Sequence, residues 1–376
     1  MLELQCIRTE KEFLSLEPLW NGLLEKSGIS VNRTFYTFEF ARTWLTYFLT
    51  DCELLALVIK KAGQPVAILP LVKHAKKDFT QVRLLGGDSL DYHDFIMAQD
   101  REECIGAALD FLSKDVRSWD LFSLDNIPVD SPNFPALKKY GEENGRWARI
   151  EEFDSAPHVR VESGWDDFIN NVDRRIRSDT NRQLRRLCEL GELHYGKCKG
   201  PEEIAVLMDK LFEYKNRRYR DTGRQGAFED KRKRDFYLDL ARALWEKDRL
   251  ELSYLQLNDE LLAIHFGSVF QGKLYYWLPA FNPEYNKYSP SRILLMNLLK
   301  QAFDSGITEF DFGFGREPYK YEWAGSERKL YRFLYFNKTA KGLLLREWFQ
   351  SWRGVIRKNR GLHSFSKSIE KVVAGR

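Results

Sequence analysis

Residues 274–324 read LYYWLPAFNPEYNKYSPSRILLMNLLKQAFDSGITEFDFGFGREPYKYEWA and contain, in succession, a strand, a helix and a second strand. Aromatic and apolar residues predict a strand that ends near Phe281. Ser289 and Pro290 then begin an apolar helix, because serine is favoured at the N-cap and proline at the first helical position. A strand over 308–313 follows and ends in the polar loop DFGFGREPYK, residues 311–320. This order predicts an α/β arrangement.

The predicted start of this helix is a candidate phosphate site. A helix N-terminus exposes free backbone N–H groups and the positive end of the helix dipole. Ser289 and Ser291 are polar, and Arg292 adds a positive charge at the same place. Such a helix start can hold the pyrophosphate of coenzyme A. An ordinary capped helix without a ligand explains the same residues, so both interpretations stay open.

The loop after the second strand is rich in glycine and charge, as sites at strand ends often are. Asp311 alternates with Phe310 and Phe312, so it faces away from them, into solvent or a polar cleft. Asp311 is a candidate proton acceptor. The alternative is a structural carboxylate that pairs with Lys320 or Arg316.

The order of elements around this stretch occurs twice along the chain. A strand, a short turn and PVAILPLV stand in the first half, and a strand, a short turn and LLAIHFGSV stand in the second. This weak internal repeat predicts an α/β (α+β) fold of two tandem halves, each a mixed central sheet flanked by helices. The predicted bounds are 1–155 for the N-terminal half, 156–340 for the C-terminal half and 341–376 for a basic helical tail. Single helices are expected at 11–27, 34–49 and 165–190.

Composition limits the classes of function. The chain has 376 residues, 43% hydrophobic and 30% charged, which is typical of a globular protein of two domains. A formal net charge of +4 does not require a nucleic-acid partner. The five cysteines and six histidines form no metal-type cluster, so no metal is expected. Neither a secretory signal nor a membrane-spanning stretch is recognised, which predicts a cytoplasmic protein.

The tail is basic and amphipathic. Residues 338–376 hold ten Lys or Arg and two Glu. Leu345, Trp348, Trp352 and Val355/Ile356 recur at helical spacing. We expect this helix to dock on the body of the protein. The alternative is an interfacial helix on anionic lipid, which would place the protein peripherally at the inner membrane.

Segments of 274–324 closely resemble an acetyltransferase family of the GNAT superfamily, the family named for cellulose biosynthesis (CelD-like). The resemblance is carried by LPAFNPEY (278–285), YSPS (288–291), FDFGFGREPYK (310–320) and Trp323. Ser291 stands where that family usually has glycine, and Arg316 where it often has an acid. The usual GNAT glycine loop is absent. The resemblance implies two GNAT-like halves, related to Fem-type transferases that take an aminoacyl group from tRNA.

A mechanistic hypothesis then assigns roles to particular residues. Acetyl-CoA or another acyl-CoA would be the co-substrate, and a small molecule or saccharide the acceptor. The residues assigned to the acyl donor are Tyr288, Ser289, Ser291 and Arg292. Those assigned to the acceptor are Asp91, Tyr92, Asp94, Arg182, Glu317, Lys320 and Trp323. Those assigned to catalysis are His265 and Asp311 as proton acceptors, and Tyr319 and then Tyr285 as proton donors.

Several of these residues also have ordinary structural explanations. Asp91 to Asp94 follow a Gly-Gly turn, where aspartate often satisfies loop backbone. His265 alternates with apolar neighbours, as a core histidine does, yet in a cleft it would be an obvious base. Six arginines crowd 172–187, among them Arg182. They could hold a phosphorylated lipid-linked sugar, coenzyme A or tRNA, or form a solvated helix face.

Three functions are compatible with the sequence. The favoured one is a coenzyme A-dependent N- or O-acyltransferase that transfers the acyl group directly to a sugar, polysaccharide precursor or amino compound. Direct transfer is inferred because no Ser–His–Asp or Cys–His signature is recognised. The second is a Fem-type aminoacyl transferase that draws on tRNA, the one case in which nucleic acid would be a partner. The third is a non-catalytic GNAT-like binding protein, which the missing glycine loop would suit.

Overall fold

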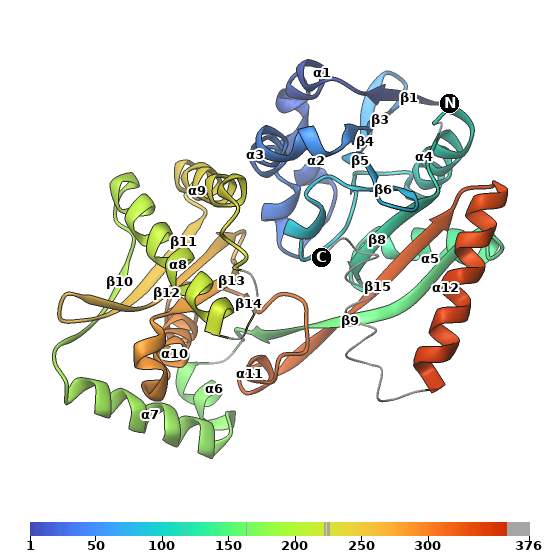
Figure 1. The fold of residues 1–376 in the computed structure, drawn as a ribbon. Helices are drawn as coiled ribbons and strands as arrows, with labels where there is room; N and C mark the ends of the chain where they lie inside the picture. The colour runs from blue at the N-terminus through green and yellow to red at the C-terminus, as the bar shows by residue number, and fades with distance from the viewer. Residues whose placement is uncertain (117, 163, 222, 224–225, 359–376) are drawn as a thin grey trace. The chain divides into compact units, whose positions relative to one another are not determined.

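The described chain divides into two compact units (Figure 1). The computed structural model describes residues 1–116, 118–162, 164–221, 223 and 226–358, with side chains up to Ser351. Unit 1 comprises Met1–Asp154 and the described residues from Lys329 onward, and unit 2 comprises Ser155–Arg328. The strands β9 (Ala148–Arg160) and β15 (Ser326–Phe336) each run from one unit into the other. The predicted functional halves and tail, bounded at 155 and 340, stay predictions.

Unit 2 is built on a mixed sheet in the order β10-β11-β12-β13-β14-β9. The bounds of its other strands are Leu193–Lys197 (β10), Leu250–Leu257 (β11), Glu260–Phe270 (β12), Lys273–Phe281 (β13) and Glu309–Asp311 (β14). Neighbouring strands are antiparallel except β13 and β14, which are parallel. A parallel pair needs a crossover, and here the crossover is a helix that covers one face of the sheet.

Helices cover both faces of this sheet. Their bounds are Trp165–Asn171 (α6), Arg174–Cys188 (α7), Pro201–Asp221 (α8), Lys231–Glu246 (α9), Pro290–Asp304 (α10) and Pro318–Tyr321 (α11). Tyr276 of β13 lies in the apolar core with the buried residues of α10. Its neighbour Trp277 contacts Tyr237 of α9 at 5.4 Å between ring centroids. Because successive strand residues point to opposite faces, α10 and α9 lie on opposite sides of the sheet.

Unit 1 has the same kind of architecture. One antiparallel sheet has the order β1-β3-β4-β7, with bounds Leu2–Ile7, Ala56–Lys61, Gln64–Leu69 and Ile96–Met97. Next to β15, the other strands of the unit follow in the order β8 (Leu121–Pro128), β6 (Thr80–Leu84), β5 (Leu71–Ala75) and β2 (Glu53–Leu54). The helices are α1 (Glu10–Leu14), α2 (Glu17–Lys26), α3 (Phe38–Phe48), α4 (Arg101–Asp115) and α5 (Phe134–Glu143).

In the described part of each unit, a parallel strand pair is joined through a helix. In unit 1, β6 and β8 are parallel, and α4 lies between them in the chain. In unit 2, β13 and β14 are parallel, and α10 lies between them. The predicted fold class, an α/β chain with a mixed sheet flanked by helices in each half, is confirmed.

The sequence wrongly predicts three single helices. The expected helix over 165–190 is α6 and α7, because Val172 is extended and the Asp173 side chain accepts a hydrogen bond from the Arg175 N–H at 2.7 Å to cap a new helix. The expected helix over 11–27 is α1 and α2, and the one over 34–49 is a 3-10 turn followed by α3, which begins after the capping residue Thr37. Local caps therefore interrupt patterns whose apolar spacing is continuous.

The tail forms α12 (Ala340–Lys358), which packs on other elements of unit 1. Leu345 and Phe349 pack against a small apolar cluster of Leu121, Leu334 and Phe336. Lys341 also pairs with Asp120 at 2.7 Å. The side chains of Trp352, Val355 and Ile356 lie outside the described residues. Within the described part of the chain, no helix is long and apolar enough to cross a membrane.

Candidate functional site

The parallel strands of unit 2 separate beside the start of α10. β13 and β14 pair only over Lys273–Tyr275 and Glu309–Asp311. Beyond these residues β13 continues to Phe281, whereas Phe312 donates its N–H to the Pro157 carbonyl at 3.1 Å. Among the described residues no strand pairs with the β14-facing edge of β13 after Tyr275. We call this edge and its surroundings the opening.

His265 and Tyr276 are stacked next to the opening. Their ring centroids are 4.4 Å apart and their planes differ by 7°. The Trp277 N–H donates to Nε2 of His265 at 3.3 Å, so the ring carries its proton on Nδ1. Within the described residues, the buried Nδ1 has no hydrogen-bond partner.

The electrostatics of this pair keep the histidine neutral and the tyrosine protonated. Burial, and then the positive charges of Lys215 and Lys197, lower the pKa of His265 to about 3. Burial, followed by the neighbouring Tyr319, raises the pKa of Tyr276 well above its usual value, while a hydrogen bond with Ser291 opposes the rise. Tyr276 is therefore a hydrogen-bond donor throughout the neutral range, and His265 in this arrangement is a poor base.

The structure thus brings together three residues that the sequence singled out. His265 stacks on Tyr276, and both Ser291 and Tyr319 of the 311–320 loop are close enough to influence the pKa of Tyr276. Ser291 is half-buried at the start of α10, so this helix start does not lie deep in apolar packing. The helix start and the loop therefore both approach Tyr276.

The start of α10 differs in detail from the prediction. Ser289 has φ 51° and ψ 49°, and its side chain makes no capping hydrogen bond. Arg292 bonds Asp179 of α7 at 2.7 Å, and the exposed Arg182 bonds the same carboxylate. These pairs tie α7 to the helix start and partly neutralise Arg292.

Two further cations lie over a tyrosine at this point. Arg186 of α7 lies 4.9 Å from the ring centroid of Tyr288, and Lys287 lies 5.0 Å from it. Tyr288 closes the 3-10 helix η4 (Pro283–Tyr288) that leads into α10. The donor-site residues predicted from the sequence, Tyr288 to Arg292, thus lie beside four cationic side chains: Arg182, Arg186, Lys287 and Arg292. Such a surface suits a polyanion at a helix start.

Asp311 occupies a different environment. It is 2% exposed and accepts a hydrogen bond from the Gly313 N–H at 2.8 Å. Arg328 lies 3.8 Å from its second oxygen and also bonds Glu309 at 3.0 Å. Phe310 and Phe312, by contrast, contact Tyr276. Asp311 therefore faces a buried ion-pair cluster that includes Arg328, a partner that the sequence did not indicate.

The 311–320 loop is held together from inside. Lys320 is buried and donates to the Phe314 carbonyl at 2.6 Å, and it pairs with Glu317 at 3.0 Å. Gly315 has φ 106°, and a Cβ there would lie 2.7 Å from the Glu317 carboxylate. Trp323 packs in the core beneath α10, and in the described chain its Nε1 has no hydrogen-bond partner. These side chains shape the loop that presents Tyr319.

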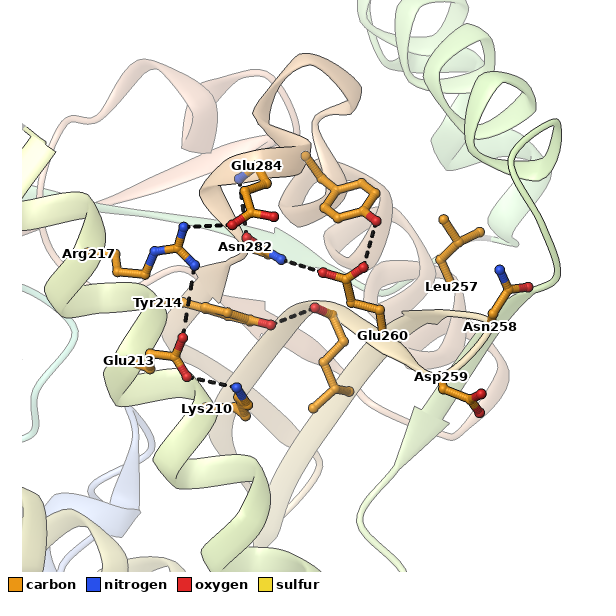
Figure 2. A pocket seen from close by; sticks show the side chains of 12 residues that line it. Lys210, Glu213, Tyr214, Arg217, Leu257, Asn258, Asp259, Glu260, Asn282 and Glu284 are labelled. Carbon is orange, nitrogen blue, oxygen red and sulfur yellow. Dashed lines mark hydrogen bonds and ion pairs between the residues drawn. The ribbon is translucent and has the colours of Figure 1, made fainter.

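Tyr285 lies in the wall of a pocket of about 600 Å³, shown in Figure 2. Its hydroxyl donates to Glu260 at 2.7 Å, and this bond raises the pKa of Tyr285 to about 12. Asn282 bonds the same carboxylate at 2.9 Å, and Arg217 bonds Glu284 at 2.9 Å. The polar lining is largely occupied by its own contacts, which makes Tyr285 a weaker candidate for proton donation than Tyr276.

The first-half candidates belong to unit 1. Tyr92 is fully buried, and Asp91 is half-buried. Asp94 accepts hydrogen bonds from Ser131 at 2.6 Å and Asn133 at 2.7 Å. Burial, only partly offset by these bonds, raises the pKa of Asp94 to about 6. The Asp94 carboxylate therefore organises the interior of unit 1.

Sequence reasoning missed Tyr276 and Lys215. Alternation along β13 predicts that Tyr276 lies on the same face as Leu274, so the sequence could have indicated its position. In the structure it also contacts Phe310 of β14. Lys215 sits in EYKNRR on α8, which has the pattern of a solvated charged face. In the structure it is half-buried, and burial together with Arg218 lowers its pKa to about 8. In the described chain no carboxylate lies within ion-pair distance of it.

A model of a known protein family matches the segment that contains the start of α10 and the 311–320 loop. Residues 174–321 match the model of the acetyltransferase (GNAT) domain. This match indicates an acyltransferase domain of the GNAT type within residues 174–321. No curated protein matches the sequence.

Solved structures are similar over nearly the whole chain. FemX has 15% identity and a TM-score of 0.59, covering 89% of this chain and 97% of its own. L-PGS from Bacillus licheniformis has 13% identity and a TM-score of 0.53, covering 90% and 94%. A tandem GNAT protein from the clavulanic acid biosynthesis pathway has 11% identity and a TM-score of 0.50, covering 89% and 98%. At these identities the similarity shows the fold, and the predicted pair of tandem GNAT-like domains is confirmed.

Proposed function

We propose that this chain transfers an acyl group, in the first instance acetyl, from an acyl-coenzyme A directly to an amine or hydroxyl group. The observation that supports this most strongly is the convergence at the start of α10. There, Ser291 lies near enough to Tyr276 to lower the pKa of its hydroxyl, and the same helix start carries the cations Arg186, Lys287 and Arg292. A carrier with phosphates and a reactive thioester needs both features within one site.

In this proposal the donor is held at the start of α10. Backbone N–H groups of the first turn and the cations Arg186, Lys287 and Arg292 would take the pyrophosphate. Ser289 and Ser291 would add hydroxyl contacts, and the Tyr288 ring would keep Arg186 in place. The acyl chain would then enter the opening, where backbone groups of β13 are not used by a neighbouring strand and one N–H can polarise the thioester carbonyl.

The transfer itself needs one bond formed and one broken. The acceptor nitrogen or oxygen attacks the thioester carbon, and the carbon–sulfur bond then breaks. Tyr276, kept protonated by its surroundings, and Tyr319 beside it would donate a proton to the departing thiolate. Lys215 would accept the proton that the acceptor loses, since a pKa of about 8 suits such a transfer near neutral pH. His265 would orient Tyr276 through the ring stack.

For the acceptor we propose a sugar, a polysaccharide precursor or an amino compound. This rests on the resemblance of LPAFNPEY, YSPS and FDFGFGREPYK to the cellulose-biosynthesis family. The acceptor assignments made from sequence, which include Glu317 and Trp323, belong to this proposal. So do a cytoplasmic location and a part in polysaccharide biosynthesis.

The test measures donor binding before the acceptor is known. Acetyl-CoA titrated calorimetrically into the full chain should bind, and replacing Arg186 and Lys287 together by Ala should weaken binding about tenfold or more. Arg174→Ala is the matched control. Arg174 is exposed on the same helix, twelve residues from Arg186 and so about 18 Å away along the axis. Thiol release is then followed with a panel of amines and sugars. Absence of acyl-CoA binding, or an equal effect of the control, would overturn the proposal.

A second candidate, a Fem-type transferase that uses charged tRNA, is favoured by one observation. Arg174, Arg175 and Arg185 are exposed on α7, and within the described residues no acid lies within ion-pair distance of them. The similarity of the fold to FemX is a second reason to consider this candidate. Tight binding of charged tRNA that falls steeply with salt, without binding of acetyl-CoA, would favour this candidate.

A further inference from the structure

The outward face of α12 carries two large apolar side chains. Leu344 is 71% exposed and Trp348 is 40% exposed. They are four residues apart and therefore lie on one face of the helix. Their neighbours Leu345 and Phe349 are the ones that pack against Leu121, Leu334 and Phe336 of unit 1. Docking of the helix thus covers one apolar stripe and leaves a second one open to solvent.

Positive charge is concentrated in the same segment. Residues 338–376 hold ten Lys or Arg and two Glu, a net charge of +8, against +4 for the whole chain. The remaining residues therefore carry a net charge of −4. Of these cations, Lys338, Lys341 and Arg346 stand just before α12 or on the part of it whose side chains the structure describes. An anionic partner is consequently drawn to this end of the sequence and not to the chain as a whole.

We propose that this face of α12 binds an anionic lipid surface. Tryptophan and leucine beside lysine and arginine are the side chains that place a helix in the plane of a bilayer interface. Two apolar side chains alone bind a bilayer only weakly. The attraction between anionic headgroups and a polybasic segment adds the electrostatic energy that makes the attachment stable.

Other occupants fit less well. A second copy of the chain would bring two strongly positive segments together, which opposes a symmetric contact through this face. A stable protein interface needs about 800 Å² on each partner, and two side chains do not supply that area. The lipid proposal does not depend on acyl transfer, because it concerns α12 and unit 1 alone.

The experiment is co-sedimentation of the full chain with vesicles. Neutral phosphatidylcholine vesicles are compared with vesicles that also contain phosphatidylglycerol. The test variant is Leu344→Ser with Trp348→Ser. The control variant is Leu190→Ser with Val206→Ser, because these side chains are 49% and 63% exposed in unit 2. Circular dichroism of both variants verifies that the fold is kept.

We expect the wild-type chain and the control variant to bind the anionic vesicles. Binding should weaken in high salt and should be slight with phosphatidylcholine alone. The test variant should bind at least about tenfold more weakly. The proposal is wrong if the wild-type chain does not sediment with anionic vesicles, or if both variants lose binding equally. It is also wrong if ultracentrifugation shows a dimer that the test variant abolishes while vesicle binding is absent.

Discussion

The stability of unit 2 should fall on mild acidification because His265 resists protonation. The pKa of His265 is about 3 in the folded chain, against about 6.5 for an unperturbed histidine. A base whose pKa is lowered by folding stabilises the fold above its unfolded pKa, and that contribution is lost as the pH falls. Integrating between pH 7 and pH 5 gives a loss of about 2 kcal/mol from this one group.

The measurement isolates that contribution by difference. Urea unfolding followed by circular dichroism at the two pH values gives the free energy of unfolding of the wild-type chain and of His265→Gln. Glutamine keeps an acceptor toward the Trp277 N–H but does not titrate. The control is His194→Gln, which removes an exposed histidine of β10. The wild-type chain and the control should lose about 2 kcal/mol more than His265→Gln. Equal losses in all three would refute the environment described for His265.

Four further outcomes are expected. Gly267→Ala should destabilise the chain by about 1–3 kcal/mol in urea unfolding, because the new Cβ would lie 2.2 Å from the Tyr275 carbonyl oxygen; an unchanged midpoint contradicts this. Tyr276→Phe should lower kcat about 10²-fold or more while binding of acetyl-CoA, measured by calorimetry, is kept. Lys215→Met should lower kcat and remove a pH-rate limb near pH 8, where the pKa of Lys215 lies; an unchanged profile excludes it as the base. The Asp94 pKa of about 6 means that the folded state favours the protonated acid, so this group adds about 1 kcal/mol to the free energy of unfolding when the pH is lowered from 7 to 5, and the contribution is lost as the pH rises. Asp94→Asn should remove this pH-dependent gain.

The order of elements could be predicted from the sequence because apolar spacing is a local signal. The parallel pair β13 and β14 with α10 between them follows from alternation, a serine and proline at a helix start, and a return to alternation. The interruptions at Val172 and Thr37 could not be read from that spacing. They depend on capping bonds that compete with a continuing helix, and the apolar pattern passes through them unchanged.

The site could be predicted only in part. Ser291, Tyr319 and His265 were singled out, yet what joins them is Tyr276, a residue that the pattern assigns to the core. Arg328 was missed as the partner of Asp311 because it lies on a later strand, and such a pairing is set by sheet topology. The left-handed backbone of Ser289 was also hidden, since a serine before a proline is typical of an ordinary cap.

Alternation along β14 separates two kinds of chemistry in unit 2. Phe310 and Phe312 contact Tyr276 on the face of α10, while Glu309 and Asp311 lie on the other side with Arg328. Removing one member of such a buried ion-pair cluster leaves an uncompensated charge, which destabilises a fold by about 3–5 kcal/mol. An Asp311 variant can therefore lose activity simply because unit 2 is less stable. Tyr276→Phe removes only a neutral hydroxyl and keeps the buried ring, so a loss of turnover there reports on the reaction itself.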